Sequence, residues 1–184
     1  DDLDRHPLSM LMIDVDYFKR INDQHGHNVG DQALIHMAGV IKEAAPKNAI
    51  PVRYAGDEFL ILLRGRQKTD ACAVAQKVLH VVRKRPFFAP DTEIEIPLTV
   101  SIGVAAAPDD AVEAKALIKQ ADAAMYAAKQ SGRDRFCDAE VITGRSAIPK
   151  TALQYLDSVG IAGRKAQLAR ISSALEKVAK GTSQ

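Results

Sequence analysis

The chain alternates between apolar runs, which predict buried strands, and stretches with helical periodicity. Leu8–Val15 and Leu98–Ala106 are almost continuously apolar, a pattern typical of central strands buried on both faces of a sheet. Two shorter runs, Ile50–Tyr54 and Phe59–Leu63, flank a short polar turn and predict a β-hairpin. Two weaker strand signals follow, at Glu93–Ile96 and at Arg133–Cys137, the latter as an edge strand.

A short helix-compatible segment, Tyr17–Asp23, follows the first strand. Apolar residues recur every three to four positions in three further stretches, Asp31–Ala45, Ala71–Arg85 and Glu113–Gln130, which predicts amphipathic helices. We expect Asp16 to cap the first helix and Thr69 or Asp70 to cap the third, because short polar side chains accept the free N–H groups of a helix start. Hairpins mixed with helices predict an α+β layered fold rather than a Rossmann sheet, and neither standard glycine-rich phosphate loop occurs.

The last part of the chain differs in character from the rest. We expect one domain over residues 1–137, followed by a linker and a helical tail over 138–184. Within that tail, Gly163–Lys180 has an amphipathic pattern whose apolar stripe needs a partner, either the domain or another chain.

Composition narrows the class of protein. The 184 residues carry a net charge of +2, which is too small to favour nucleic acid or an anionic membrane as a partner. No apolar run approaches the roughly 20 residues of a membrane span, and the absence of Trp disfavours a base-stacking surface. Cys72 and Cys137 are isolated and predict no disulfide framework, so we expect a cytoplasmic location.

The candidate chemistry centres on adjacent acids at the hairpin tip. Asp57 and Glu58 follow Ala55 and Gly56, and their mutual repulsion is relieved by a shared cation or proton. Taken alone, this stretch is as typical of a solvated acidic turn as of a divalent metal site. Asp14 ends an apolar strand, where an acid must be paired, hydrated or bound to metal. The His25-x-His27 spacing favours a transition metal only weakly, because no third such ligand is near in sequence.

Five motifs occur in order along the chain. They are Asp14-Val15-Asp16-Tyr17-Phe18-Lys19-Arg20-Ile21-Asn22-Asp23, Gly26-His27-x-x-Gly30-Asp31, Arg53-Tyr54-Ala55-Gly56-Asp57-Glu58-Phe59, Thr99-Val100-Ser101-Ile102-Gly103-Val104-Ala105 and Ala121-Asp122-x-Ala124-Met125-Tyr126-x-Ala128-Lys129-x-x-Gly132-Arg133. Taken together, these motifs resemble the catalytic domain of diguanylate cyclases, the GGDEF family of bacterial signalling enzymes. The resemblance covers about Leu8–Cys137.

The resemblance implies a fold similar to nucleotidyl cyclases and polymerase palms, with a central, mostly antiparallel sheet wrapped by helices. It also implies that two GTP molecules are condensed into cyclic di-GMP with release of two pyrophosphates. Each domain holds one GTP, so a homodimer of facing domains is expected to be needed for catalysis. Fused sensor or output domains are expected in the full protein, and no contact with nucleic acid or membrane is expected from this segment.

The resemblance assigns the acids to metal binding and catalysis. Asp14, Asp57 and Glu58, with the carbonyl of Val15, are implied to hold two Mg²⁺ ions per active site, with Mn²⁺ as an alternative. Asp57 or Glu58 is also implied to assist deprotonation of the attacking 3′-hydroxyl. Clustered oxygen ligands suit these hard cations, which stabilise both the attacking and the leaving oxygen.

The substrate-binding residues implied by the resemblance fall into three groups. The helix start at Tyr17 and Phe18 would receive the triphosphate, because helix N-termini favour anions. Lys129 and Arg133, predicted one helical turn apart, would also bind the triphosphate; alternatively, they complement the helix dipole. Asn22 and Asp31 would read guanine, since an acid accepts from its N1 and N2 hydrogens; the alternative for Asp31 is a helix cap.

The chain departs from the family pattern at three places. Ala55 replaces the first signature Gly, which would strain the turn by roughly 1–2 kcal/mol if that position needs a positive φ. Pro46-Lys47-Asn48-Ala49 replaces the inhibitory Arg-x-x-Asp, so no inhibitory site is predicted. The family segment that precedes the first strand is missing from residues 1–7. Ala55 and the missing segment keep open a catalytically silent GTP-binding regulatory module. A third, weaker hypothesis is a scaffold whose tail helix mediates assembly.

Overall fold

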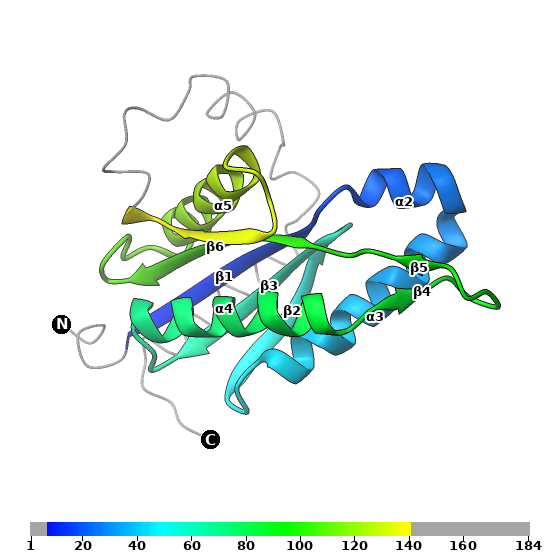
Figure 1. Ribbon diagram of the computed structural model, residues 1–184. Helices are drawn as coiled ribbons and strands as arrows, with labels where there is room; N and C mark the ends of the chain where they lie inside the picture. Colours follow the sequence, from blue (N-terminus) through cyan, green and yellow to red (C-terminus); the bar gives the residue numbers. More distant parts are fainter. Residues whose placement is uncertain (1–6, 141–184) are drawn as a thin grey trace.

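A five-stranded sheet forms the centre of the computed structural model, which describes residues 7–140 (Figure 1). The strand order is β2-β3-β1-β6-β7. β1 pairs antiparallel with β3 and with β6, and only β7 runs parallel to its neighbour. The bounds are β1 Leu8–Val15, β2 Ala49–Ala55, β3 Glu58–Arg64, β6 Val100–Ala107 and β7 Arg135–Asp138. The predicted α+β fold with a mostly antiparallel sheet is therefore confirmed.

Helices cover both faces of this sheet (Figure 1). The alternation of side chains along β1 explains the arrangement, since successive residues point to opposite faces. Leu11 and Ile13 pack into a core with helices α3 and α4, whereas Met10 and Met12 pack into a second core with α5. The bounds are α2 Phe18–His25, α3 His27–Ala44, α4 Lys68–Lys84 and α5 Ala114–Gln130.

The elements agree with the sequence prediction except at some helix starts. α3 begins at His27 because Gly26, with φ 84°, makes the turn out of α2, so Asp31 lies inside α3 and does not cap it. α4 begins at Lys68 after Gln67, with no side-chain cap, so the predicted capping by Thr69 or Asp70 is wrong. The Glu93–Ile96 signal is realised as β5, Glu95–Ile96, which pairs with the unpredicted β4, Phe87–Phe88.

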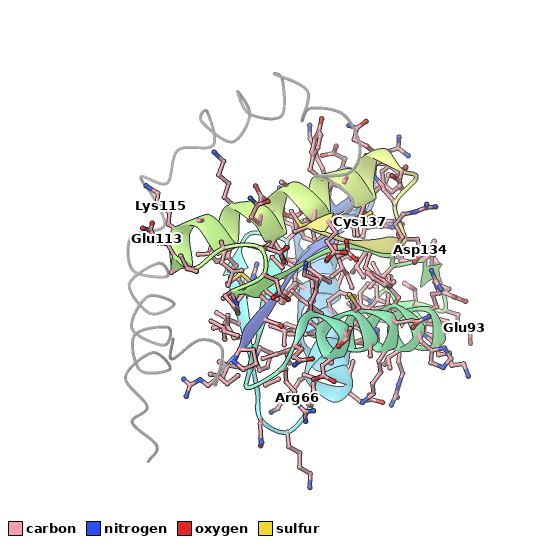
Figure 2. The ribbon with its side chains drawn as sticks, turned by 90° about the vertical axis from the view of Figure 1, so that its left-hand side faces the viewer. Arg66, Glu93, Glu113, Lys115, Asp134 and Cys137 are labelled. Carbon is pink, nitrogen blue, oxygen red and sulfur yellow. The ribbon has the colours of Figure 1, made fainter. Side chains whose placement is uncertain are left out.

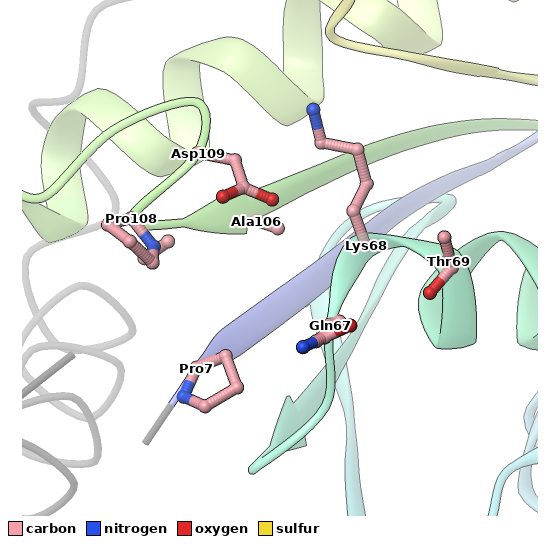
Figure 3. A pocket seen from close by; sticks show the side chains of 8 residues that line it. Pro7, Gln67, Lys68, Thr69, Ala106, Pro108 and Asp109 are labelled. Carbon is pink, nitrogen blue, oxygen red and sulfur yellow. The ribbon is translucent and has the colours of Figure 1, made fainter. Parts of the chain in front are cut away.

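A pocket of about 340 Å³ lies near the start of β1, at the opposite end of that strand from Asp14 (Figure 3). It contains none of the predicted site residues. Its lining consists of Pro7, Gln67, Lys68, Thr69, Ala106, Ala107, Pro108 and Asp109. Beside it, the buried Lys68 ammonium lies 2.7 Å from Asp110 Oδ1 and closes the space between α4 and the loop after β6.

The predicted tail helix lies outside the described residues. Within residues 7–140, no helix is long and apolar enough to span a bilayer.

Candidate active site

Three polar side chains form a row across the centre of the sheet. In the antiparallel ladders, Asp14 of β1 lies opposite Glu58 of β3 on one side and Ser101 of β6 on the other. Directly opposed residues in an antiparallel pair share a face and have Cα atoms about 4.5–5.5 Å apart. The register therefore places two predicted metal ligands side by side, on the face that α5 covers.

Asp14 is buried, with 7% of its surface exposed. Burial raises its pKa to about 6, and the nearby Asp57 and Asp16 carboxylates act in the same direction. The ammonium of Lys129, in the last turn of α5, opposes this shift with Nζ only 2.8 Å from Asp14 Oδ1. Burial thus disfavours the ionised form of Asp14, and the Lys129 ammonium favours it.

The hairpin turn brings Asp57 to the same place. Gly56 takes φ 46°, whereas Ala55 does not take a positive φ and ends β2 beside a bulge. The turn is held from two sides: Arg53 Nε donates to the Gly56 carbonyl at 2.9 Å, and Val15 N donates to the Asp57 carbonyl at 3.2 Å. The methyl group of Ala55 therefore costs no left-handed strain, and only Gly56 needs glycine's freedom.

The predicted ligands have the donor chemistry that a hard divalent cation prefers, although their side chains do not yet converge. They are the carboxylates of Asp14, Asp57 and Glu58, and carboxylate oxygens are the preferred ligands of Mg²⁺ and Mn²⁺. In this arrangement the cation on Asp14 is the Lys129 ammonium. Within residues 7–140, no three His, Cys, Asp or Glu side chains are drawn together into a ready metal cage, and this includes the region of His25 and His27.

The two residues predicted to read guanine come together where α2 meets α3. The Asn22 side chain lies directly over Gly30, so close that a Cβ at Gly30 would overlap Asn22 Oδ1. Asp31 follows Gly30 and is exposed. The absence of a side chain at Gly30 therefore leaves the space that the Asn22 amide occupies, one residue before Asp31.

Arg133 lies beyond α5 rather than on it. The predicted spacing of one helical turn from Lys129 is wrong, because α5 ends at Gln130 and Arg133 takes φ 61° in the following turn. Its guanidinium carbon lies 4.6 Å from the centroid of the Tyr17 ring, and Arg20 lies 4.7 Å from the same ring. Tyr17 and Phe18 lead directly from β1 into α2, so Arg133 sits over the helix start predicted to receive the triphosphate.

Asp16 does not cap α2, contrary to the prediction. The N-cap residue is Tyr17, in a left-handed conformation, and no side-chain cap is present. The buried Asp16 carboxylate instead accepts from Thr99 Oγ1 at 2.8 Å, Ser101 Oγ at 2.7 Å and Asp134 N at 3.1 Å. Sequence reasoning missed this cluster, although two hydroxyl residues at alternate positions of an apolar strand were a signal for it.

Known proteins show the same domain. The sequence profile described as "Diguanylate cyclase, GGDEF domain" matches residues 2–135. The chain belongs to the GGDEF diguanylate cyclase domain family. It is 37% identical over 131 residues to diguanylate cyclase A from Treponema denticola, covering 71% of this chain and 35% of that protein. It is also 34% identical over 134 residues to the cyclic di-GMP phosphodiesterase PdeR from Escherichia coli, covering 73% of this chain and 20% of that protein.

Solved GGDEF domains share the fold as well as the sequence. The GGDEF domain of YfiN (TpbB) from Pseudomonas aeruginosa superposes with a TM-score of 0.71 at 33% identity, covering 74% of this chain and 86% of that one. The chain spans about a third or less of the length of the two curated relatives named above. The similarity therefore concerns the GGDEF domain and not the whole of either relative.

Proposed function

We propose that this GGDEF domain is a diguanylate cyclase that condenses two GTP molecules into cyclic di-GMP and releases two pyrophosphates. The observation that carries the proposal is the cross-strand pair of Asp14 and Glu58, with Asp57 beside it and Lys129 on Asp14. A buried acid with a raised pKa, next to further carboxylates and a basic side chain, supports a functional site here, and the family match supports phosphoryl transfer as its reaction.

The carboxylates would hold the metal ions of the reaction. Asp14, Asp57 and Glu58, with the carbonyl of Val15, are the proposed ligands, and two Mg²⁺ ions bound there would neutralise charge on the attacking and leaving oxygens. Metal ions held by Asp14 would take over from the Lys129 ammonium as its counter-charge, and Lys129 would then be available to bind the triphosphate. Asp57 or Glu58 would accept the proton of the attacking 3′-hydroxyl.

The substrate would lie across the end of β1. Arg133 and Lys129 would bind the triphosphate at the start of α2, where the backbone of Tyr17 and Phe18 adds N–H donors. Asn22 and Asp31 would hold the guanine at the junction of α2 and α3. One chain offers one such half-site, so the reacting 3′-hydroxyl and α-phosphate would meet only when two chains face each other.

Product analysis tests this proposal directly. The purified chain, at concentrations that enforce dimers, should convert GTP into cyclic di-GMP when Mg²⁺ is present. Asp57→Ala and Glu58→Ala should each abolish turnover while leaving the fold intact. Asp109→Ala is a matched control, because Asp109 is an exposed acid beside the pocket at the opposite end of β1. Absence of product from the wild-type chain under these conditions would refute cyclase activity.

A second candidate is a catalytically silent GTP-binding module that regulates an attached domain. Two observations favour it. The Lys129 ammonium forms an ion pair with Asp14, a predicted metal ligand, and a relative with this domain carries the name of a phosphodiesterase. Calorimetry separates the two, because tight GTP binding without product supports the silent module, whereas turnover excludes it.

A further inference from the structure

The buried Asp16 carboxylate joins three separate parts of the chain. Only 5% of Asp16 is exposed. Its Oδ1 accepts from Ser101 in β6, and its Oδ2 accepts from Thr99, the residue just before β6, and from the backbone N–H of Asp134. The Asp16 backbone N–H donates to the Thr99 carbonyl at 2.9 Å. Hydrogen bonds to an ionised carboxylate are about twice as strong as neutral ones, so this is a firm anchor.

The segment anchored by Asp16 is conformationally strained. Gly132, Arg133 and Asp134 take successive positive φ angles of 111°, 61° and 45°. A non-glycine residue in this region costs roughly 1–2 kcal/mol and persists where surrounding contacts enforce it.

Arg83 of α4 provides the second restraint on this turn. Its Nε lies 3.0 Å from Asp134 Oδ2, and its Nη2 donates to the Asp134 carbonyl at 2.8 Å. Figure 2 labels Asp134 in this turn, between α5 and β7. The exposed Arg83 and the buried Asp16 thus hold Asp134 through different atoms.

We propose that Asp16 is a positioning residue, whose carboxylate holds the 132–134 turn and thereby fixes Arg133 over Tyr17 at the triphosphate site. The inference rests on the proposed function in one respect, namely that Arg133 binds the triphosphate. Its geometric basis does not depend on the proposed function, because Asp134 is the chain neighbour of Arg133 and Tyr17 is the chain neighbour of Asp16. One anchor therefore fixes both partners of the contact between the Arg133 guanidinium and the Tyr17 ring.

An amide at this position distinguishes anchoring from a need for negative charge. In Asp16→Asn the amide oxygen can still accept from Thr99 and Asp134, while its NH₂ group faces Ser101, whose hydroxyl can turn to accept. Asp16→Ala removes every acceptor. An anchoring role therefore predicts that Asn rescues what Ala loses, whereas a metal-binding or purely electrostatic role predicts that Asn fails.

Nucleotide binding is the first test. Calorimetry with guanosine 5′-(β,γ-imido)triphosphate and Mg²⁺ should show about tenfold weaker binding for Asp16→Ala, the size expected for one misplaced charge-assisted contact, and near wild-type binding for Asp16→Asn. Arg133→Ala should lose a similar factor, and the double variant should lose no more than Arg133→Ala alone. Binding of GMP, which lacks the β- and γ-phosphates, should be unchanged in all of them.

Hydrogen exchange of the Asp134 amide, followed by NMR, is the second test and needs no nucleotide. Asp16→Ala should speed this exchange at least tenfold, while Asp16→Asn should leave it near the wild-type rate. If the Ala variant fails to fold, Thr99→Val, which removes one donor to the carboxylate, should give a smaller change in the same direction.

Several results would overturn the inference. They are unchanged triphosphate binding in Asp16→Ala, equal losses for Asn and Ala, or an equal loss for GMP, which would indicate a general structural defect. A wild-type chain that binds no analogue would instead refute the proposed function. In that case the hydrogen exchange of the Asp134 amide alone would test whether Asp16 anchors the turn. An unchanged exchange rate in Asp16→Ala would refute the anchoring role as well.

Discussion

The raised pKa of Asp14 predicts a specific pH dependence of folding stability. Asp14 has an ordinary pKa of 3.8 and a folded-state value of about 6, raised first by burial. Between these values the folded chain binds more protons at Asp14 than the unfolded chain does. The free energy of unfolding should therefore fall as pH rises from about 4 to about 7. The difference between these two pKa values corresponds to about 3 kcal/mol.

Replacing the acid by its neutral isostere removes this titration. In metal-free buffer, Asp14→Asn should match wild type near pH 4 and should exceed its stability by up to about 3 kcal/mol at pH 7. Urea unfolding at pH 4 to 7.5, followed by circular dichroism, measures this difference. Asp109→Asn, at an exposed position, controls for the general effect of removing one negative charge. A difference that does not change with pH, or an Asn variant less stable at pH 7, would refute the reasoning.

Lys129 provides an internal check on the same prediction. Its ammonium holds the pKa of Asp14 below the value that burial alone would produce. Lys129→Met should therefore raise the pKa further and extend the loss of stability above pH 7. Saturating Mg²⁺ should raise the stability of the wild-type chain at pH 7 but not that of Asp14→Asn, since a ligand stabilises only the folded state that binds it.

Three further predictions concern glycines and the turn before β2. Gly103→Ala should destabilise the fold by roughly 3 kcal/mol in urea unfolding, because a Cβ there would overlap the backbone of α5; a neutral change would contradict the close packing. Gly30→Ala should displace the Asn22 amide and weaken binding of the GTP analogue about tenfold with little net loss of stability, because the gain in helix propensity offsets the overlap. Gly39→Ala in the same helix meets nothing within 4 Å and should leave that binding unchanged. Cyclic di-GMP added to the turnover assay should not inhibit through residues 46–49, and inhibition abolished by changes there would show that this prediction is wrong.

The strands were predictable because burial leaves a plain sequence pattern. Leu8–Val15 is apolar at almost every position, and it forms a central strand with both neighbours antiparallel. Helix starts were less predictable, because a side chain that could cap a helix, such as Asp16, can accept hydrogen bonds from other donors instead. Its hydroxyl donors are more than 80 residues away, and no local propensity reports such a pairing.

The sequence allowed the residues of the candidate site to be proposed, but not their arrangement in space. The acids Asp14, Asp57 and Glu58 stand at strand ends and a turn, where local patterns point to them. The ion pair of Lys129 with Asp14 joins the end of α5 to the end of β1, and it follows from the packing of α5 on the sheet. The position of Arg133 depends on a turn with positive φ angles at Gly132, Arg133 and Asp134. The sequence of this turn is compatible with that conformation but does not determine it.

The register between β1 and β3 also sets where the domain can tolerate insertions. Strand side chains alternate with a period of two. One residue added between Phe59 and Arg64 would therefore move the side chains of part of β3 to the opposite face of the sheet, and Glu58 would no longer pair with Asp14. A residue added in the turn at 46–48 would leave that ladder untouched. If single-residue insertions are tested for GTP turnover, those inside β3 should abolish it, whereas those in the turn before β2 should leave it unchanged.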